Sequence, residues 1–188
     1  MNLLDTRERI LTTAQALAQQ RGFNAFSYAD IATAVGVRKA SIHHHFPSKD
    51  DLELALVQRY RQQFAVQLER IDRDEPTAPG RLSAYGGLYR ATLEGGAICL
   101  CGMMASDIRA LPDALRQPLL EFFGEHADWL AAVLDSGRRN GELAFLGPAL
   151  RRAQGVLAAL QGALIMAHAA QDVRTFDELL DDLLSGIC

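Results

Sequence analysis

Apolar side chains recur along most of the chain at the three- and four-residue spacing of a helix face. The first such stretch begins near Asp5 or Thr6 and ends at Gly22, with its apolar positions at Ile10, Leu11, Ala14, Leu17 and Ala18. No stretch shows the convincing period-two alternation that a half-buried strand requires. The pattern predicts an all-α protein.

Helix start and stop signals divide the chain into nine predicted helices. Ser27 with Asp30, and Thr175 with Glu178, have the spacing of a capping box, and Ser48 precedes two aspartates in a first turn. Pro118 stands one turn inside the seventh helix, so it predicts a kink or a later start. The predicted helices cover roughly 5–21, 28–35, 38–44, 49–73, 81–93, 97–109, 112–139, 148–170 and 175–185.

Charge is distributed unevenly between the two parts of the chain. Residues 1–50 carry six basic and four acidic side chains, whereas the remainder carries 13 basic and 19 acidic ones. Both lysines of the chain, Lys39 and Lys49, fall in the first part. A basic N-terminal part joined to an acidic remainder indicates a polyanionic partner for the N-terminal part alone. We therefore divide the chain into domains at 1–50 and 51–188.

Residues 27–46 predict two short helices joined by a turn at Gly36. Apolar positions such as Ile31, Val35 and Ile42 would pack the pair against the first helix, which leaves cationic and small polar side chains on the outer surface of the second. A helix with such residues near its N-terminus fits the major groove of DNA. This pattern predicts a helix-turn-helix.

The segment FSYADIATAVGVRKASIHHHFPSKDDL (26–52) resembles the DNA-binding region of the tetracycline-repressor (TetR) family. Ile31-Ala32, Gly36-Val37, His45-Phe46, Lys49 and Leu52 fall on the family pattern. His43 departs from it, because the family usually has a Tyr there that touches the DNA backbone. The resemblance implies a nine-helix regulator with an N-terminal three-helix DNA-binding domain and a C-terminal helical domain for ligand binding and dimerisation. The DNA-binding candidates are Ser27, Tyr28, Arg38, Lys39, Ser41, His43, His44 and Lys49.

The last two predicted helices carry small and apolar residues at helical spacing, which allows helices to approach closely. Such stripes also occur in an ordinary intrachain core, but the resemblance implies that these helices form a four-helix homodimer interface. A two-fold dimer would read a palindromic operator in double-stranded DNA. The interface candidates are Gly155, Ala159, Gly162, Ile165, Leu179 and Leu183.

The resemblance also implies a pocket for a small-molecule effector inside the C-terminal domain. Most apolar and aromatic residues there are ordinary core, and a few polar groups would orient the ligand. The candidates are Tyr89, Cys99, Met103, Phe123, His126, Trp129 and His168. An effector that prefers the DNA-incompetent state would release the operator. Repression is the expected mode, and activation stays open.

The glycine-flanked segment 95–112 contains Cys99 and Cys101 and resembles a branch of the family that senses electrophiles or oxidants. A thiol-based sensor is thus an alternative, beside simple packing of two small apolar side chains. Two positions apart on a helix, these cysteines point about 200° from each other, so a disulfide between them would require local unwinding.

Other function classes find little support in the sequence. We identify no phosphate loop, zinc-protease spacing or nucleophile elbow, so an enzyme is a remote alternative, as is a helical adaptor without DNA binding. The adjacent histidines His43–His45 point in different directions and cannot chelate one metal ion. We expect neither metal nor cofactor. The N-terminus lacks a signal-peptide core, and we find no run of about 18 apolar residues, which predicts a soluble cytoplasmic protein without membrane contact.

Overall fold

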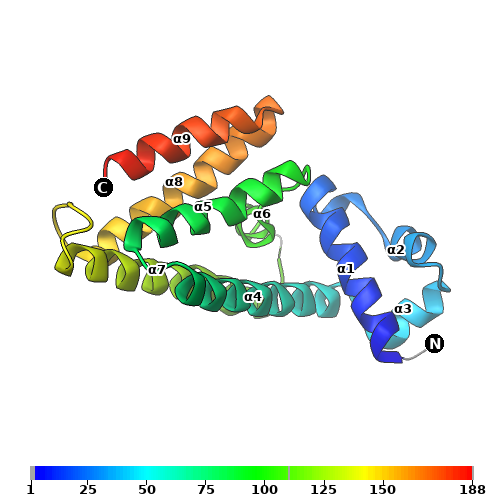
Figure 1. The fold of residues 1–188 in the computed structure, drawn as a ribbon. Helices are drawn as coiled ribbons and strands as arrows, with labels where there is room; N and C mark the ends of the chain where they lie inside the picture. Colours follow the sequence, from blue (N-terminus) through cyan, green and yellow to red (C-terminus); the bar gives the residue numbers. More distant parts are fainter. Residues whose placement is uncertain (1–2, 110, 188) are drawn as a thin grey trace. The chain divides into compact units, whose positions relative to one another are not determined.

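The computed structural model describes residues 3–109 and 111–187. Within these ranges the chain is all-α and has no strand (Figure 1). Nine α-helices are found there, which confirms the predicted fold class. They are α1 (Leu3–Arg21), α2 (Tyr28–Val35), α3 (Lys39–His45), α4 (Lys49–Asp74), α5 (Ala78–Glu94), α6 (Leu100–Ser106), α7 (Arg116–Arg139), α8 (Ala149–Ala170) and α9 (Val173–Ser185), with 3-10 helices η1 (Phe23–Ala25) and η2 (Asp113–Leu115).

The helices are grouped into two compact units. The head unit comprises the described residues of Met1–Gln62 together with Leu100–Leu119, and the body unit comprises those of Gln63–Cys99 and Leu120–Cys188. Helices α4 and α7 each contribute residues to both units. The head unit therefore contains α6 in addition to the N-terminal helices. The division at residue 50 into two functional domains stays a prediction.

The head unit is built on local signals that the sequence shows directly. Both amide and hydroxyl of Ser27 donate to the Asp30 carboxylate at the start of α2, each at 2.7 Å, and Ser48 makes the equivalent pair with Asp51 before α4. Gly36 ends α2 with φ of 75°, a left-handed conformation that glycine adopts without strain. These caps confirm the predicted starts of α2 and α4.

Some predicted boundaries were wrong. Thr175 does not cap the last helix, because α9 begins two residues earlier and the Asp172 side chain accepts a hydrogen bond from the amide of Arg174. Helix α6 is shorter than 97–109, and the sequence did not reveal η1. Pro118 does delay α7, whose first residue is Arg116, since proline suits only the first turn of a helix.

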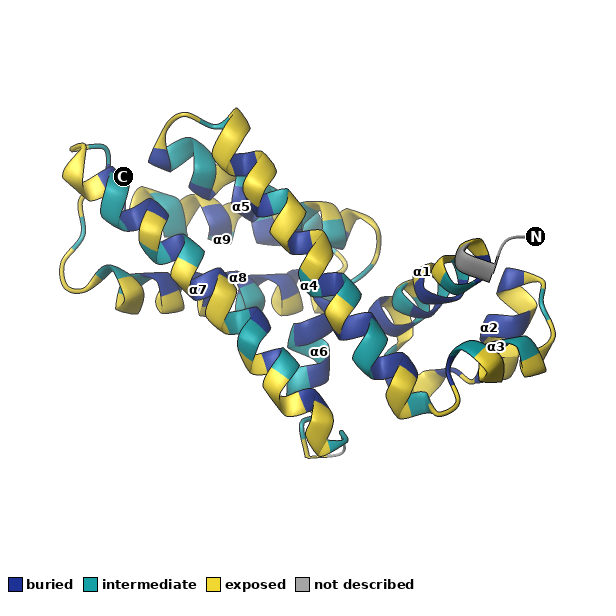
Figure 2. Cartoon of the chain, turned by 90° about the horizontal axis from the view of Figure 1, so that it is seen from below, coloured by how far each residue is buried: buried dark blue, intermediate teal, exposed yellow. Residues whose placement is uncertain are grey.

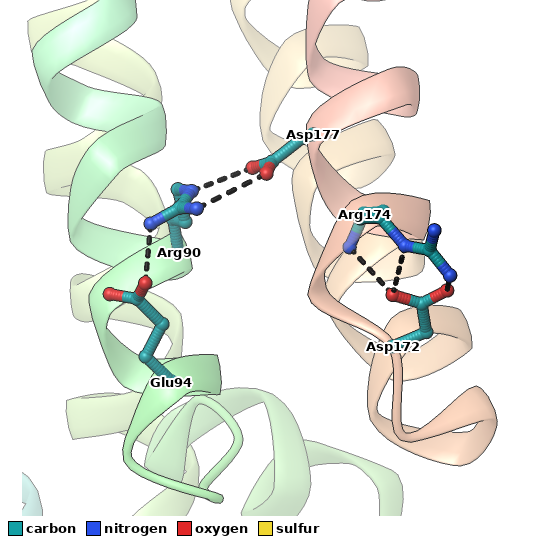
Figure 3. A network of polar contacts seen from close by, with 5 residues as sticks. All are labelled: Arg90, Glu94, Asp172, Arg174 and Asp177. Carbon is teal, nitrogen blue, oxygen red and sulfur yellow. Dashed lines mark hydrogen bonds and ion pairs between the residues drawn. The ribbon is translucent and has the colours of Figure 1, made fainter.

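In the body unit, α5, α8 and α9 pack against one another. Gly86 on α5 allows a close approach to α9, because a Cβ there would lie 2.6 Å from a methyl group of Leu180. On the same pair of helices, Arg90 binds both carboxylate oxygens of Asp177 and also Glu94 (Figure 3). The two contacts, one apolar and one ionic, fix α9 on α5.

Burial follows the faces of the helices, with buried and exposed residues on opposite sides of the long ones (Figure 2). By length and composition alone, helix α8 could cross a membrane. The sequence analysis had found no apolar run of that length. A core helix of a soluble protein passes the same test. Here seven residues of α8 are buried, Ala153, Val156, Leu157, Leu160, Ala163, Leu164 and Ala167, so the helix behaves as a core helix of the body unit.

Candidate functional site

Helix α3 presents a polar, cationic surface on one side and a buried anchor on the other. Ile42 is fully buried, whereas Arg38, Lys39 and His44 are exposed and Ser41 is half-buried. Arg38 is the N-cap residue of α3, so the two cations stand at the helix start. Side chains at this end of a recognition helix reach base edges and phosphates. The arrangement of α2, the Gly36 turn and α3 is that of a helix-turn-helix.

Tyr28, expected among the DNA contacts, faces inward. Its side chain is 8% exposed, and its hydroxyl lies 3.0 Å from the carbonyl oxygen of Phe46 and 2.5 Å from that of Ser48. Burial raises the pKa of Tyr28 to about 12, and the charges of Asp51, Asp50 and Glu53 act in the same direction. The hydroxyl is thus a neutral group that holds the turn between α3 and α4.

His43 is exposed and lies against the ring of Tyr28, with centroids 4.8 Å apart. Its Nδ1 is 3.4 Å from the carbonyl oxygen of Pro47. Ser27 is exposed at the start of α2, although its hydroxyl is engaged with Asp30. Both residues remain candidates for phosphate contacts, and each would have to share or exchange its present partner.

Lys49 begins α4 with its ammonium over two aromatic rings. Its Nζ is 4.7 Å from the centroid of Phe23 and 5.6 Å from that of Phe26. A lysine ammonium held over aromatic rings keeps its charge, while its side chain loses conformational freedom. The residue therefore presents a positioned charge at the N-terminus of a helix, where backbone amides also favour a phosphate.

The sequence did not reveal two buried polar groups of the head unit. Glu53, on α4, is 6% exposed, and its Oε2 has no hydrogen-bond partner among the described residues. The Nε2 atom of His45 is also buried and also lacks a hydrogen-bond partner there. Burial raises the pKa of Glu53 to about 7, and Asp50 adds to the shift while Lys49 opposes it. Burial likewise lowers the pKa of His45. A glutamate one turn after Lys49 looks like a surface residue in the sequence, so nothing in the pattern marked it.

In the body unit, three effector candidates belong to one buried polar network. We define it as Tyr85, Tyr89, His126, Gln161 and Cys99. The Tyr85 hydroxyl is 2.6 Å from Nδ1 of His126 and 3.1 Å from the Tyr89 hydroxyl. Nε2 of Gln161 is 3.4 Å from both the Tyr89 hydroxyl and Sγ of Cys99. The sequence analysis missed Tyr85 and Gln161, because a tyrosine and a glutamine at helical spacing carry no distinctive signal.

The remaining effector candidates are dispersed. Trp129 lies against Tyr85, with centroids 5.4 Å apart, and Phe123 contacts Phe122 at the edge of the same cluster. Met103 instead lines a 290 Å³ groove of the head unit, and His168 lines a separate 330 Å³ cleft between the ends of α5 and α8. Met103 and His168 thus lie apart from the cluster around Tyr85, and the assignment of the seven residues to an effector pocket stays a prediction.

The interface candidates lie on the outer side of α8 and on α9. Gly155, Ala159 and Ile165 are exposed, and Gly162, Leu179 and Leu183 are half-buried. A Cβ added at Gly155 or Gly162 would meet open space. Large exposed apolar side chains are also found on this helix at Ile165 (57%) and Met166 (58%). Small and apolar side chains on this surface are thus not covered by other parts of the chain.

Comparison with known proteins identifies the family. The model for "Bacterial regulatory proteins, tetR family" matches residues 10–56. A TetR-family transcriptional regulator from Agrobacterium tumefaciens is 36% identical, covers 99% of both chains and superimposes with a TM-score of 0.94. The chain belongs to the TetR family of transcriptional regulators. A TetR regulator from Legionella pneumophila agrees, at 32% identity, full coverage of both chains and a TM-score of 0.88.

A named relative is the HTH-type transcriptional repressor NemR of Escherichia coli. It is 28% identical over 183 residues, which cover 94% of this chain and 90% of NemR. The family match on 10–56 includes α2, α3 and the start of α4, so it falls on the helix-turn-helix described above. The family match therefore falls on the segment for which the sequence predicted DNA binding.

The two described cysteines of this TetR regulator are reduced and buried, Cys99 at 2% and Cys101 at 0% exposure. A thiol that is buried away from solvent is inaccessible to oxidants and electrophiles in solution. Family membership and a DNA-binding regulatory function do not require a thiol switch. Among the residues that the structure describes, no three His, Cys, Asp or Glu side chains are grouped to hold a metal ion.

Proposed function

We propose that the regulator is a homodimeric repressor that binds a palindromic operator and releases it when a small molecule binds the body unit. The observation that carries the proposal is the exposed face of α3. Arg38 and Lys39 lie at the start of this helix and His44 lies in its last turn, while Ile42 is buried and anchors the helix. Repression, rather than activation, is supported by relatives such as NemR, named as a transcriptional repressor. Such a protein acts where the chromosome is, in the cytoplasm, and without a catalytic step.

Dimerisation is supported by the uncovered face of α8. Glycines without neighbours at their Cβ positions let a second helix approach closely, and Ile165 and Met166 provide apolar area for it. A two-fold axis through this face would place two α3 helices in successive turns of the major groove, which is why the operator should be palindromic.

Effector response is supported by the connectivity of α4. This helix begins beside the DNA-binding element at Lys49 and continues into the body unit after Gln62. A ligand that binds one state of the body better than the other shifts the population of both states. A continuous helix that contributes to both units is a physical route for that shift.

The test is a gel-shift titration with DNA fragments from the gene's own neighbourhood, repeated over a range of salt concentrations. The repressor should bind a fragment with dyad symmetry and lose affinity steeply as salt rises, because each phosphate contact releases a counterion. Transcription from that fragment should fall when the protein is added. Absence of salt-sensitive binding to any fragment would contradict the proposal, and stimulated transcription would contradict repression.

A further inference from the structure

The head unit contains a groove of 290 Å³ between the end of α1 and the region of α6. One wall is formed by residues 21–25, which end α1 and form η1, and the other wall by Met103, Met104, Asp107 and Leu111. Both walls belong to the same compact unit. Ligand pockets in proteins occupy about 300–1,000 Å³, so a groove near the lower end of this range suits a molecule of amino-acid size.

The groove has an apolar lining to which both walls contribute. Phe23 is 6% exposed, Met104 is 1% exposed, and Met103 is half-buried. Unbranched methionine side chains adapt their shape to what they contact, and their sulfur atoms pack favourably against aromatic rings. The lining therefore fits an aliphatic or aromatic side chain of a ligand better than a polar one.

Two side chains of opposite charge border the same groove, Arg21 at the end of α1 and Asp107 after α6, and both are exposed. Within the described part of the chain, neither side chain forms an ion pair or a hydrogen bond. The pKa of Asp30 is lowered mainly by hydrogen bonds from Ser27, and Arg21 adds to this effect at longer range. The groove thus presents one cationic and one anionic group, from opposite walls, with which a ligand can pair.

We propose that this groove binds a zwitterionic, apolar α-amino acid, such as phenylalanine or leucine, as a ligand distinct from the effector of the body unit. The ammonium group of the amino acid pairs with Asp107, and its carboxylate pairs with Arg21. Its side chain packs on Phe23, Met103 and Met104. A molecule with only one of the two charges leaves the other charged group of the protein unpaired, so the groove selects for a zwitterion.

Phe23 connects the groove to the DNA-binding element. Its ring also lies under the ammonium group of Lys49, 4.7 Å from Nζ to the ring centroid. The 3-10 helix η1 leads directly to Ser27, the N-cap residue of α2. An amino acid bound between η1 and α6 stabilises the folded arrangement of these segments, because a ligand that binds only the folded state raises its stability.

The test is isothermal titration calorimetry of the full chain at neutral pH with three probes of one shape. L-Phenylalanine carries both charges, 3-phenylpropanoate lacks the ammonium group, and phenethylamine lacks the carboxylate. L-Phenylalanine should bind saturably, about 3- to 10-fold more tightly than either analogue, and should raise the melting temperature. Equal affinity for the three probes, or no saturable binding of L-phenylalanine, would overturn the proposal.

Two substitutions of exposed residues should give crossed results. Asp107→Asn should remove the advantage of L-phenylalanine over 3-phenylpropanoate and keep its advantage over phenethylamine, and Arg21→Gln should do the reverse. The matched controls Asp113→Asn and Arg116→Gln change an exposed ion pair outside the groove and should keep both preferences. Unchanged preferences in Asp107→Asn and Arg21→Gln, or equal losses in the controls, would contradict the assignment.

The titrations are made without DNA, so their outcome is independent of the proposed repression. If a gel shift shows operator binding and L-phenylalanine does not bind, the amino-acid site is wrong and the proposed function stands. If L-phenylalanine binds with the expected preferences and no DNA fragment is bound, the proposed function fails and the site stands. The comparison of the three probes on the wild type also holds if a variant folds poorly.

Discussion

The hydroxyl of Tyr28 lies 3.0 Å from the carbonyl oxygen of Phe46, a residue 18 positions later in the chain. This contact joins the first residue of α2 to the end of α3. A second acceptor, the carbonyl of Ser48, extends it to the residue before α4. One buried hydroxyl therefore determines how the recognition helix leads into the helix that follows it.

Tyr28→Phe should destabilise the protein by about 1 kcal/mol, because the carbonyl groups of Phe46 and Ser48 lose the single O–H proton that they share. Operator affinity should fall along with it. Urea unfolding measures the stability, and Thr33→Ala, which removes an exposed hydroxyl bonded to the carbonyl of Ala29, should cost less than about 0.5 kcal/mol. Weaker DNA binding with unchanged unfolding would instead make Tyr28 a direct phosphate contact.

Lys39→Ala should weaken binding to the preferred operator by about 1–3 kcal/mol and relax base preference, as expected for a lost base contact. Lys39 is exposed at the start of α3, so its removal leaves the fold intact. Fluorescence anisotropy on operator and on scrambled DNA measures both quantities. Arg73→Ala, an exposed cation of the body unit, should bind as wild type; equal losses in the two variants would refute the α3 assignment.

Lys49→Ala should weaken binding on operator and scrambled DNA to the same degree. A phosphate contact carries no sequence information, so the slope of log affinity against log salt should fall by roughly one unit. Since its ammonium also lies over Phe23 and Phe26, unfolding without DNA should show an added loss of about 0.5–1 kcal/mol. A salt slope equal to that of wild type would exclude the phosphate contact.

Gly162→Leu should yield monomers that bind DNA poorly. The protomer has open space at this Cβ, and leucine favours a helix over glycine, so the substitution should block only the approach of a second copy. Sedimentation velocity gives the assembly state, and circular dichroism checks the helices. Gly124→Leu, also open at its Cβ but on α7, should remain dimeric. An intact dimer in Gly162→Leu would place the interface elsewhere.

Glu53 should make the protein less stable as pH rises. Its pKa is raised from 4.5 to about 7 in the folded protein, so between these values the folded state holds a proton that the unfolded state has lost. Stability from this group is therefore present at low pH and lost as pH approaches 7. The change amounts to at most about 3 kcal/mol.

Glu53→Gln should remove that part of the pH dependence and unfold at higher urea than wild type near pH 8. The amide is neutral throughout, so other titrating groups act equally on both proteins and cancel in the difference. Asp128→Asn, an exposed carboxylate of the body unit, should leave the profile unchanged. If the free energy of unfolding changed with pH in the same way for wild type and Glu53→Gln, the Glu53 carboxyl would already be solvated or paired.

The sequence by itself determined the helices, most of their ends and which side of α3 is exposed. These depend on contacts within a few residues: Ser27 with Asp30, Ser48 with Asp51, and the left-handed conformation of Gly36. Helical periodicity also separates the buried Ile42 from the exposed Lys39, because the two sides of a short helix differ by residue spacing alone. Family resemblance covers the same residues, so motif and local physics agree.

Tertiary structure decided what depends on distant neighbours. Tyr28 is turned inward by carbonyls 18 and 20 residues away, and Tyr85 meets His126 across 41 residues. Glu53 loses its solvent to packing that no local pattern records, which is why its pKa shift was missed. Met103 and His168 were named as candidates for the pocket that the family resemblance implies, and in the fold they line different clefts. Side-chain burial and long-range hydrogen bonds depend on which helices become neighbours, and periodicity along one helix carries no such information.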